Sequence, residues 1–153
     1  MASRRDEIRM SDEEVRSFIA EQMVMQCATV GAGGFPHLVP LWYVPDGLEL
    51  VGWTYAKSQK AKNLERLSRA TIGIADGVQY HELRGVMMEC DVGLERDPVQ
   101  VERYGLSLFK RYAGDLGPEI REMVAGQARK RVGLRFVPSR VVSWDHRKLG
   151  GTY

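Results

Sequence analysis

Lysines are concentrated in one short stretch of this chain, the segment WTYAKSQKAKN at positions 53–63. Ser58 is a favourable N-cap residue, and apolar residues repeat at helical spacing after it, so the sequence predicts that a helix begins here. A helix N-terminus carries partial positive charge and unpaired N–H groups, so Lys57, Lys60 and Lys62 lower stability unless an anion lies among them. The segment therefore predicts a phosphate-binding site, with a solvated basic helix start as the alternative reading.

Aromatic residues lie close to this segment on two predicted strands. They are Trp42, Tyr43, Trp53 and Tyr55. Their ring faces are suited to line a slot for a flat heterocycle, and a flat ring with a phosphate tail suggests a flavin. Two other readings stay open: the rings belong to the core, or they stack on single-stranded nucleic acid. The nucleic-acid reading requires a broader basic stripe than this sequence shows.

Other kinds of chemistry have little support in the sequence. No GxSxG nucleophile motif and no GxGxxG dinucleotide fingerprint occurs. The histidines at positions 37, 81 and 146 have no metal-ligand spacing, among themselves or with cysteine. Cys27 and Cys90 are far apart and form no CxxC pair, so we interpret both as buried thiols. We therefore assign no catalytic side chain and expect no metal site.

Length and composition indicate one soluble domain spanning residues 1–153. The apolar fraction is 44%, and no apolar run is long enough for a membrane span. The first ten residues have no apolar h-region behind them, so we expect no secretory signal and a cytoplasmic protein. A net charge of +2 is too small to indicate nucleic-acid binding by itself.

The predicted elements place the lysine segment between a sheet and its flanking helices. A capping box at Ser11 begins a helix at about Asp12 that continues into the low twenties. Strands are expected at 27–32, 36–44, 48–54, 70–75, 83–95 and from 132, with helices opening at Pro98 and Pro118. Pro40 cannot donate a ladder hydrogen bond, so the second strand should have an edge, a bulge or a ligand beside it. These elements predict a mostly antiparallel α+β fold, a sheet closed or half-closed into a barrel with helices outside.

Four stretches together resemble one protein family. They are PHLVPLWYVPDG, TYAKSQKAKNLERL, ELRGVMMECDV and the ending RVVSWDHRKLGGTY. The pattern is similar to the split-barrel flavin and deazaflavin-dependent reductases, which are related to the pyridoxamine 5′-phosphate oxidases. It is closest to the small actinobacterial members that use the deazaflavin coenzyme F-420. The resemblance covers nearly the whole chain, and it is specific for fold and cofactor class but not for substrate.

The resemblance implies a split β-barrel homodimer with two cofactor sites at the subunit interface. The residues that it implies for cofactor binding are Val39, Pro40, Leu41 and Trp42 beside the ring system, and Lys57, Ser58, Lys60 and Asn63 around the phosphate. It also places the strand that starts at Arg84-Gly85 near the cofactor, where glycine permits close backbone approach. The tail around Trp144 is expected to reach the partner's site, and Lys62 and Trp53 receive no role.

The activity implied by the resemblance is hydride transfer between reduced coenzyme F-420 and an unsaturated or conjugated small molecule. The proton for the reduced substrate can come from solvent, Tyr43, Tyr55 or a lysine of the segment. Two alternatives remain. The cofactor can be FMN, or the protein can bind and store its cofactor without turnover. Nucleic acid and membranes are not expected as partners.

Overall fold

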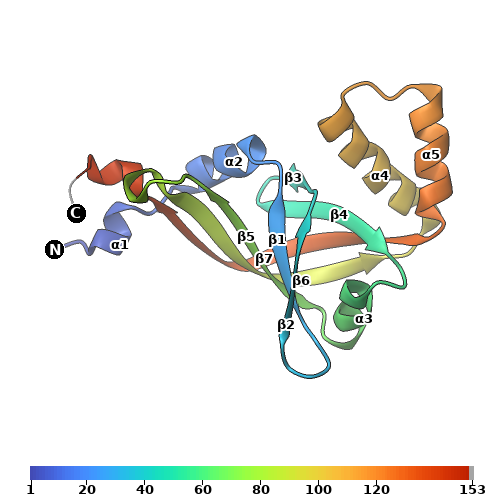
Figure 1. Cartoon of the computed structure of the whole chain (residues 1–153), viewed down its shortest axis with the longest axis horizontal. Helices are drawn as coiled ribbons and strands as arrows, with labels where there is room; N and C mark the ends of the chain where they lie inside the picture. The colour runs from blue at the N-terminus through green and yellow to red at the C-terminus, as the bar shows by residue number, and fades with distance from the viewer. Residues whose placement is uncertain (152–153) are drawn as a thin grey trace.

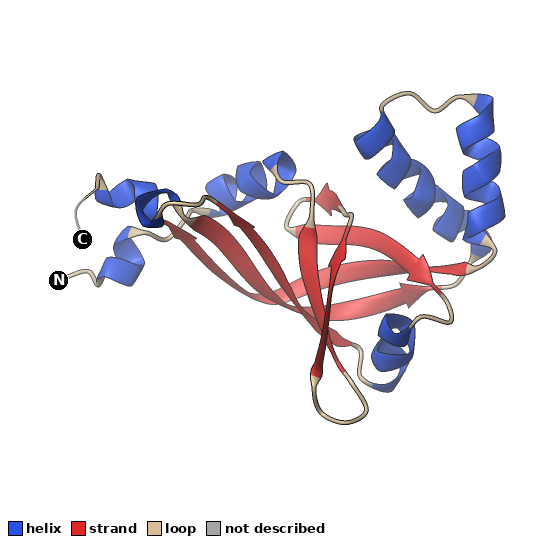
Figure 2. Ribbon diagram, viewed as in Figure 1, coloured by secondary structure: helices blue, strands red, loops and turns tan. Residues whose placement is uncertain are grey.

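A sheet of seven antiparallel strands, in the order β2-β1-β5-β6-β7-β4-β3, forms the centre of the structure. The computed structural model describes residues 1–151 of the chain. The strands are β1 (Met25–Val30), β2 (Pro36–Leu41), β3 (Val44–Asp46), β4 (Glu49–Tyr55), β5 (Arg69–Asp76), β6 (Arg84–Glu95) and β7 (Arg131–Asp145). The sheet is strongly curled (Figure 1), and helices flank it (Figure 2). The predicted α+β half-barrel is confirmed.

The hairpin of β1 and β2 is confirmed, but β2 is shorter than the predicted strand 36–44. Cys27 pairs with Val39 in the antiparallel register, and β2 is an edge strand, the first of the three possibilities that Pro40 indicated. The strand ends at Leu41 because Tyr43 turns into the core, where its backbone N–H donates to the Tyr112 hydroxyl at 3.0 Å. The chain then continues as β3 at the opposite edge of the sheet.

The helices follow their sequence signals. They are α2 (Asp12–Glu21), α3 (Gln59–Arg66), α4 (Pro98–Ala113) and α5 (Pro118–Ala128), with a short α1 (Arg4–Glu7) and the 3-10 helices η1 (Tyr80–Glu82) and η2 (His146–Leu149). The capping box at Ser11 is present, since its hydroxyl accepts from the Glu14 N–H and the Glu14 carboxylate accepts from the Ser11 N–H. The sequence missed α1 because four residues with no buried side chain leave no apolar pattern. Every helix among residues 1–151 is too short or too polar to cross a membrane.

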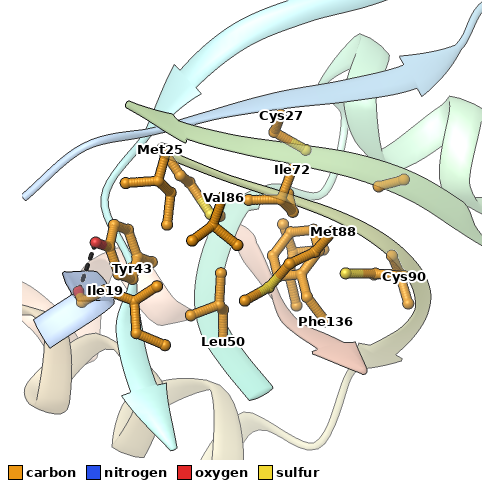
Figure 3. Close-up of a cluster of buried hydrophobic side chains, with 14 of the residues drawn as sticks. Ile19, Met25, Cys27, Tyr43, Leu50, Ile72, Val86, Met88, Cys90 and Phe136 are labelled. Atoms are coloured by element: carbon orange, nitrogen blue, oxygen red, sulfur yellow. Dashed lines mark hydrogen bonds between the residues drawn. The ribbon is translucent and has the colours of Figure 1, made fainter. Parts of the chain in front are cut away.

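The main core fills the inner face of the curled sheet (Figure 3). Leu50, Ile72 and Phe136 come from different strands, and each is fully buried. The two cysteines lie in the same cluster, as predicted, and both are free thiols. Burial raises the pKa of Cys27 to about 11 and that of Cys90 to about 12, so neither is an activated nucleophile.

The two longest strands pair with each other, and β6 is bonded to β7 along its whole length. Buried and exposed residues alternate in β6 from Met88 to Gly93, as its sequence predicts. A register shift between Glu89 and Cys90 lets the ladder continue past Pro138. The closing strand therefore runs unbroken to Asp145, further than its alternating apolar residues alone indicate.

A second apolar cluster attaches α4 and α5 to the sheet. It consists of Trp53, Val101, Leu108, Val124 and Ala128. Gly105 permits the closest contact, because a Cβ atom there would lie 2.3 Å from the Trp53 ring. Gly126 on α5 has no atom within 4 Å of the equivalent position. The small residue at 105 therefore lets α4 pack on Trp53.

These two helical glycines form a matched pair for measuring the packing. We predict that Gly105→Ala destabilises the protein by about 1–3 kcal/mol, because the methyl group overpacks the contact with Trp53. Gly126→Ala should stabilise it by about 0.5–1 kcal/mol through helix propensity alone. Urea unfolding of both variants measures the difference. Equal stabilisation by both changes would show that α4 does not pack tightly on Trp53.

Candidate functional site

The lysine segment forms the predicted strand, short loop and helix N-terminus. Strand β4 ends at Tyr55, and the Ser58 N–H donates to the Tyr55 carbonyl at 3.0 Å to close the turn. Ser58 is the N-cap of α3, and its hydroxyl accepts from the Ala61 N–H at 3.1 Å. The first turn of α3 contains no acidic residue that would neutralise its partial positive charge. The local geometry of an anion site is therefore present.

Lys60 is a buried cation with little compensation. Its side chain lies behind the N-terminus of α3, and the residue is only 6% exposed. Its ammonium lies 3.5 Å from the Thr54 hydroxyl and forms no ion pair with a carboxylate of residues 1–151. Burial lowers its pKa and the charge of Arg131 adds to this, while Cys27 opposes it. Buried charges normally have a counter-charge, so this position is suited to an anion from outside the chain.

A cavity of about 590 Å³ adjoins the start of α3. It is lined by Tyr55, Ala56, Lys57, Ser58, Arg129 and Lys130. The basic residues at 129–130 come from the turn between α5 and β7, and the Ala56 N–H donates to the Lys130 carbonyl at 2.9 Å. Sequence reasoning missed them, although the run Arg129-Lys130-Arg131 is visible in the sequence, because only the pairing of β4 with β7 places it beside Lys57. Lys62 is exposed and lies outside the lining of this cavity.

Asn63 has a different environment from the other residues of the predicted clamp. It is fully buried, and its Nδ2 donates to the Thr29 hydroxyl on β1 at 3.1 Å. Its Oδ1 accepts from Gln59 Nε2 at 2.8 Å. The amide therefore joins α3 to the sheet and does not line the cavity beside Lys57. Its predicted contact with a phosphate remains a prediction.

Three of the four predicted ring-binding residues line a second cavity, of about 240 Å³. The lining is Pro40, Leu41, Trp42, Trp53, Leu108, Phe109, Gln127 and Arg131. Trp42 is 49% exposed, and its ring stacks on Tyr112 with centroids 4.3 Å apart. Val39, the fourth residue, pairs with Cys27 and is not in the lining. The structure thus brings Trp42 and Trp53 together in one apolar slot, which we call the aromatic slot.

Arg131 is a residue of this slot that the sequence did not single out. Its guanidinium lies 4.0 Å from the ring centroid of Tyr55 and 4.6 Å from that of Trp53. The buried Nε atom has no hydrogen-bond partner among the described residues. Arg131 is paired with Tyr55 across the β4–β7 ladder, so the sheet register and not the local sequence places it here.

Tyr43 does not contribute to the slot, contrary to the sequence-based interpretation of the aromatic residues. It is fully buried, and its hydroxyl lies 2.7 Å from the Ile19 carbonyl oxygen (Figure 3). The Gln22 carbonyl oxygen lies 2.8 Å from the same hydroxyl. Burial raises the pKa of Tyr43 to about 12, against the opposing charge of Arg111. Tyr43 is therefore unsuited to donate a proton to a substrate, whereas Tyr55 is 53% exposed.

Comparison with known proteins identifies the family. Residues 11–145 match the family described as pyridoxamine 5′-phosphate oxidase. The chain belongs to this family. A crystal structure of the conserved hypothetical protein Rv2991 from Mycobacterium tuberculosis is 41% identical, with a TM-score of 0.90 over 99% of this chain and 95% of that one. No curated protein sequence matches the chain.

More distant structures share the split-barrel fold of the pyridoxamine 5′-phosphate oxidase family. A structure of an F-420 reductase is 22% identical, with a TM-score of 0.65, and the match covers 82% of this chain and 94% of that one. HutZ, a heme storage protein from Vibrio cholerae, is 20% identical, with a TM-score of 0.67, covering 86% and 93%. These likenesses establish the architecture, and they do not assign an activity.

Gly85 on β6 is packed against this chain's own tryptophan. A Cβ atom at Gly85 would lie 2.4 Å from the ring of Trp144, its partner in the β6–β7 ladder. The absence of a side chain at Gly85 thus makes room for Trp144 of the same chain, and the expected place of this strand near the cofactor remains a prediction. Arg84 forms ion pairs with Glu21 and Asp76. Tail residues 152–153 lie outside the described part of the chain.

The structure was also searched for side chains that could bind a metal ion. Among residues 1–151, no group of three or more His, Cys, Asp or Glu side chains could hold a metal ion. His37 Nδ1 is buried without a hydrogen-bond partner within the same range, but His37 belongs to no such group of three. The side chains that can bind a ligand at the two cavities are therefore basic and aromatic residues rather than metal ligands.

The burial of Lys60 predicts that its charge lowers the stability of the free protein, although the same charge would favour anion binding. Lys60→Met should raise the free energy of unfolding by on the order of 1 kcal/mol, because it removes a buried charge that has no counter-charge. Lys62→Met, on the exposed side of α3, should change it by less than about 0.5 kcal/mol. Urea denaturation without added anions measures both. A clear loss of stability in Lys60→Met would show that the folded chain itself needs the ammonium group.

Proposed function

We propose that this protein is an oxidoreductase that binds coenzyme F-420 and transfers a hydride between it and an unsaturated or conjugated small molecule. The observation that carries the proposal is the buried, uncompensated ammonium of Lys60 behind the helix N-terminus capped by Ser58. A phosphate monoester or diester supplies the missing negative charge. Membership of the pyridoxamine 5′-phosphate oxidase family and the likeness to an F-420 reductase support a flavin-type cofactor.

The residues at the start of α3 fit a phosphate. Lys60 and Lys57 provide two ammonium groups, and the first N–H groups of the helix lack intrahelical partners. We assign the phosphate to Lys57, Ser58 and Lys60, with Asn63 holding α3 against β1 at the same place. The 590 Å³ cavity beside them leaves room for the rest of a phosphate-bearing group.

The segment Val39–Trp42 is assigned to the ring system of the cofactor. Strand β2 is an edge strand, so one side of its backbone is unpaired and free to donate and accept hydrogen bonds. The chain at Trp42 approaches β4 closely, since a Cβ atom at Gly52 would lie 3.2 Å from the Trp42 carbonyl oxygen. The aromatic slot opens beside this crossing and is lined by Pro40, Leu41 and Trp42.

The protein's part in the reaction is to orient the reactants and to exclude water. When bound, the deazaflavin supplies the hydride-carrying carbon, so no side-chain nucleophile is required. The apolar walls of the slot, Trp53 and Leu108 among them, keep water from the reacting face. Tyr55 and Lys57 are the exposed side chains near the site that can deliver a proton, besides solvent.

The proposal includes a homodimer in the cytoplasm. The β1–β2 hairpin exposes apolar side chains at the sheet edge: Val30 is 42% exposed, Phe35 84% and Leu38 62%. A second copy that covers this hairpin would bury them and bring a second chain to the cofactor sites. Two free, buried thiols suit a reducing compartment.

Two alternatives use the same residues. FMN presents a phosphate monoester to the same clamp. A storage protein that binds its cofactor without turnover is the second alternative, supported by the burial of both thiols and of the Tyr43 hydroxyl, which removes three reactive groups from the site. The titration below separates the cofactors, and a turnover assay separates enzyme from store.

The titration compares F-420, FMN and the phosphate-free deazaflavin with purified protein. We predict that F-420 binds most tightly and that Lys57→Ala combined with Lys60→Met weakens it by about 10- to 100-fold, the effect of losing charge-assisted hydrogen bonds. Phosphate-free deazaflavin should bind wild type and variant equally. Unchanged F-420 affinity in the double variant would remove the lysine segment from the site, and tighter binding of FMN would reassign the cofactor.

Turnover is measured by oxidation of the bound, reduced cofactor with a panel of enones and quinones. We expect the rate at which bound, reduced F-420 is oxidised to saturate with substrate concentration and to be proportional to the fraction of protein that holds the cofactor. Oxidation no faster than that of free reduced F-420, across the whole panel, would favour the storage reading.

The dimer is tested at the hairpin. Leu38→Glu should shift the protein from dimer to monomer in sedimentation velocity, because a charge in an apolar interface remains without a partner. Val78→Glu is the control, since Val78 is 88% exposed and lies far from the hairpin in sequence. A dimer that persists in Leu38→Glu, or a wild-type monomer, would contradict this part of the proposal.

A further inference from the structure

The aromatic slot has a composition that the cofactor clamp does not explain. Its walls are rings and aliphatic groups, Trp42, Trp53, Leu108 and Phe109, and its polar side-chain groups are those of Gln127 and Arg131 besides the two indole N–H groups. No acidic residue is in the lining. Arg131 is partly exposed, and its charge in this largely apolar slot has no counter-charge until a ligand supplies one.

The guanidinium of Arg131 is held in place but not neutralised. Its central carbon lies over the Tyr55 and Trp53 rings, at 4.0 and 4.6 Å from their centroids, and these cation–π contacts hold the group. It forms no ion pair with a carboxylate of residues 1–151, and its buried Nε has no hydrogen-bond partner there. A planar donor set that is pre-oriented in this way matches a carboxylate, which it can bind through two parallel hydrogen bonds.

The cationic groups of Lys60 and Arg131 lie on opposite faces of the sheet at β4. Successive residues of β4 point to opposite faces of the sheet, so Thr54, which contacts Lys60, and Trp53, which contacts Arg131, lie on opposite faces. The two charges are nevertheless close enough for Arg131 to lower the pKa of Lys60. Two like charges on either side of one strand are best neutralised by two separate anionic groups.

We propose that the aromatic slot is the substrate subsite and that it selects small, planar, conjugated carboxylic acids, whose carboxylate pairs with Arg131. The reaction that the bound acid undergoes rests on the proposed function, whereas its binding to Arg131 does not depend on it. The ring or conjugated chain lies against Trp53, Leu108 and Phe109, which are not assigned to the cofactor ring, and Gln127 is a second hydrogen-bond donor in the lining. A volume of about 240 Å³ lies below the ~300–1,000 Å³ typical of drug-sized ligands, so one ring with a short side chain fits.

The test uses trans-cinnamate and its neutral analogue cinnamamide as probes of equal shape. Quenching of tryptophan fluorescence reports binding, because Trp42 and Trp53 line the slot. We expect wild-type protein to bind cinnamate about 10- to 100-fold more tightly than cinnamamide. Arg131→Gln should abolish this preference, whereas Arg131→Lys, which keeps the charge without the planar fork, should retain part of it. Lys110→Gln, an exposed charge on α4 next to Phe109, should leave the preference unchanged.

Both the free and the cofactor-saturated protein are measured, so failure of the cofactor proposal leaves the slot test intact. F-420 affinity, measured separately, should be the same in Arg131→Gln and wild type. A cinnamate preference that survives Arg131→Gln, or no preference in either form of the wild-type protein, would overturn the assignment. Near-UV circular dichroism of each variant shows whether the aromatic cluster has kept its packing, and the Arg131→Lys variant decides the outcome if Arg131→Gln does not fold.

Discussion

The passage of the chain from one edge of the sheet to the other at Trp42-Tyr43 depends on Arg111. Its guanidinium donates to the carbonyl oxygens of Tyr43 at 2.6 Å and Gln22 at 2.7 Å, and it lies 4.6 Å from the Tyr43 ring centroid. One side chain of α4 thus holds the end of α2 and the start of β3 together. Because β2 and β3 are opposite edges of one curled sheet, this crossing fixes the width of the half-barrel and places Trp42 beside β4.

The same crossing explains why binding groups gather in this region. Beyond Val51, the last residue of β4 that pairs with β3, one edge of β4 has no strand neighbour. The gap is occupied on the inner face by Lys60 and on the outer face by the aromatic slot with Arg131. Neither cation has a carboxylate partner among the described residues, and the charge of buried Lys60 is unfavourable unless an anion binds.

The sequence predicted what local interactions decide. The capping box of α2, the β1–β2 hairpin and the strand-loop-helix at Ser58 depend on residues near each other in the chain, and all were found as expected. The environment of Tyr43, the tie from Asn63 to Thr29 and the position of Arg131 depend on partners far away in sequence. Periodicity shows that a residue can be buried, but the sheet register decides what it meets.

The state of the Lys60 ammonium group tests the central claim most directly. Its pKa can be followed by NMR of the ¹³Cε resonance, in the free protein and with F-420 bound. A lowered pKa in the free protein, caused chiefly by burial, should rise when the anion binds, and the affinity for F-420 should then fall as pH increases through the free-state pKa. An ordinary pKa in the free protein, or one that the cofactor leaves unchanged, would contradict the account of Lys60 as an anion-binding group.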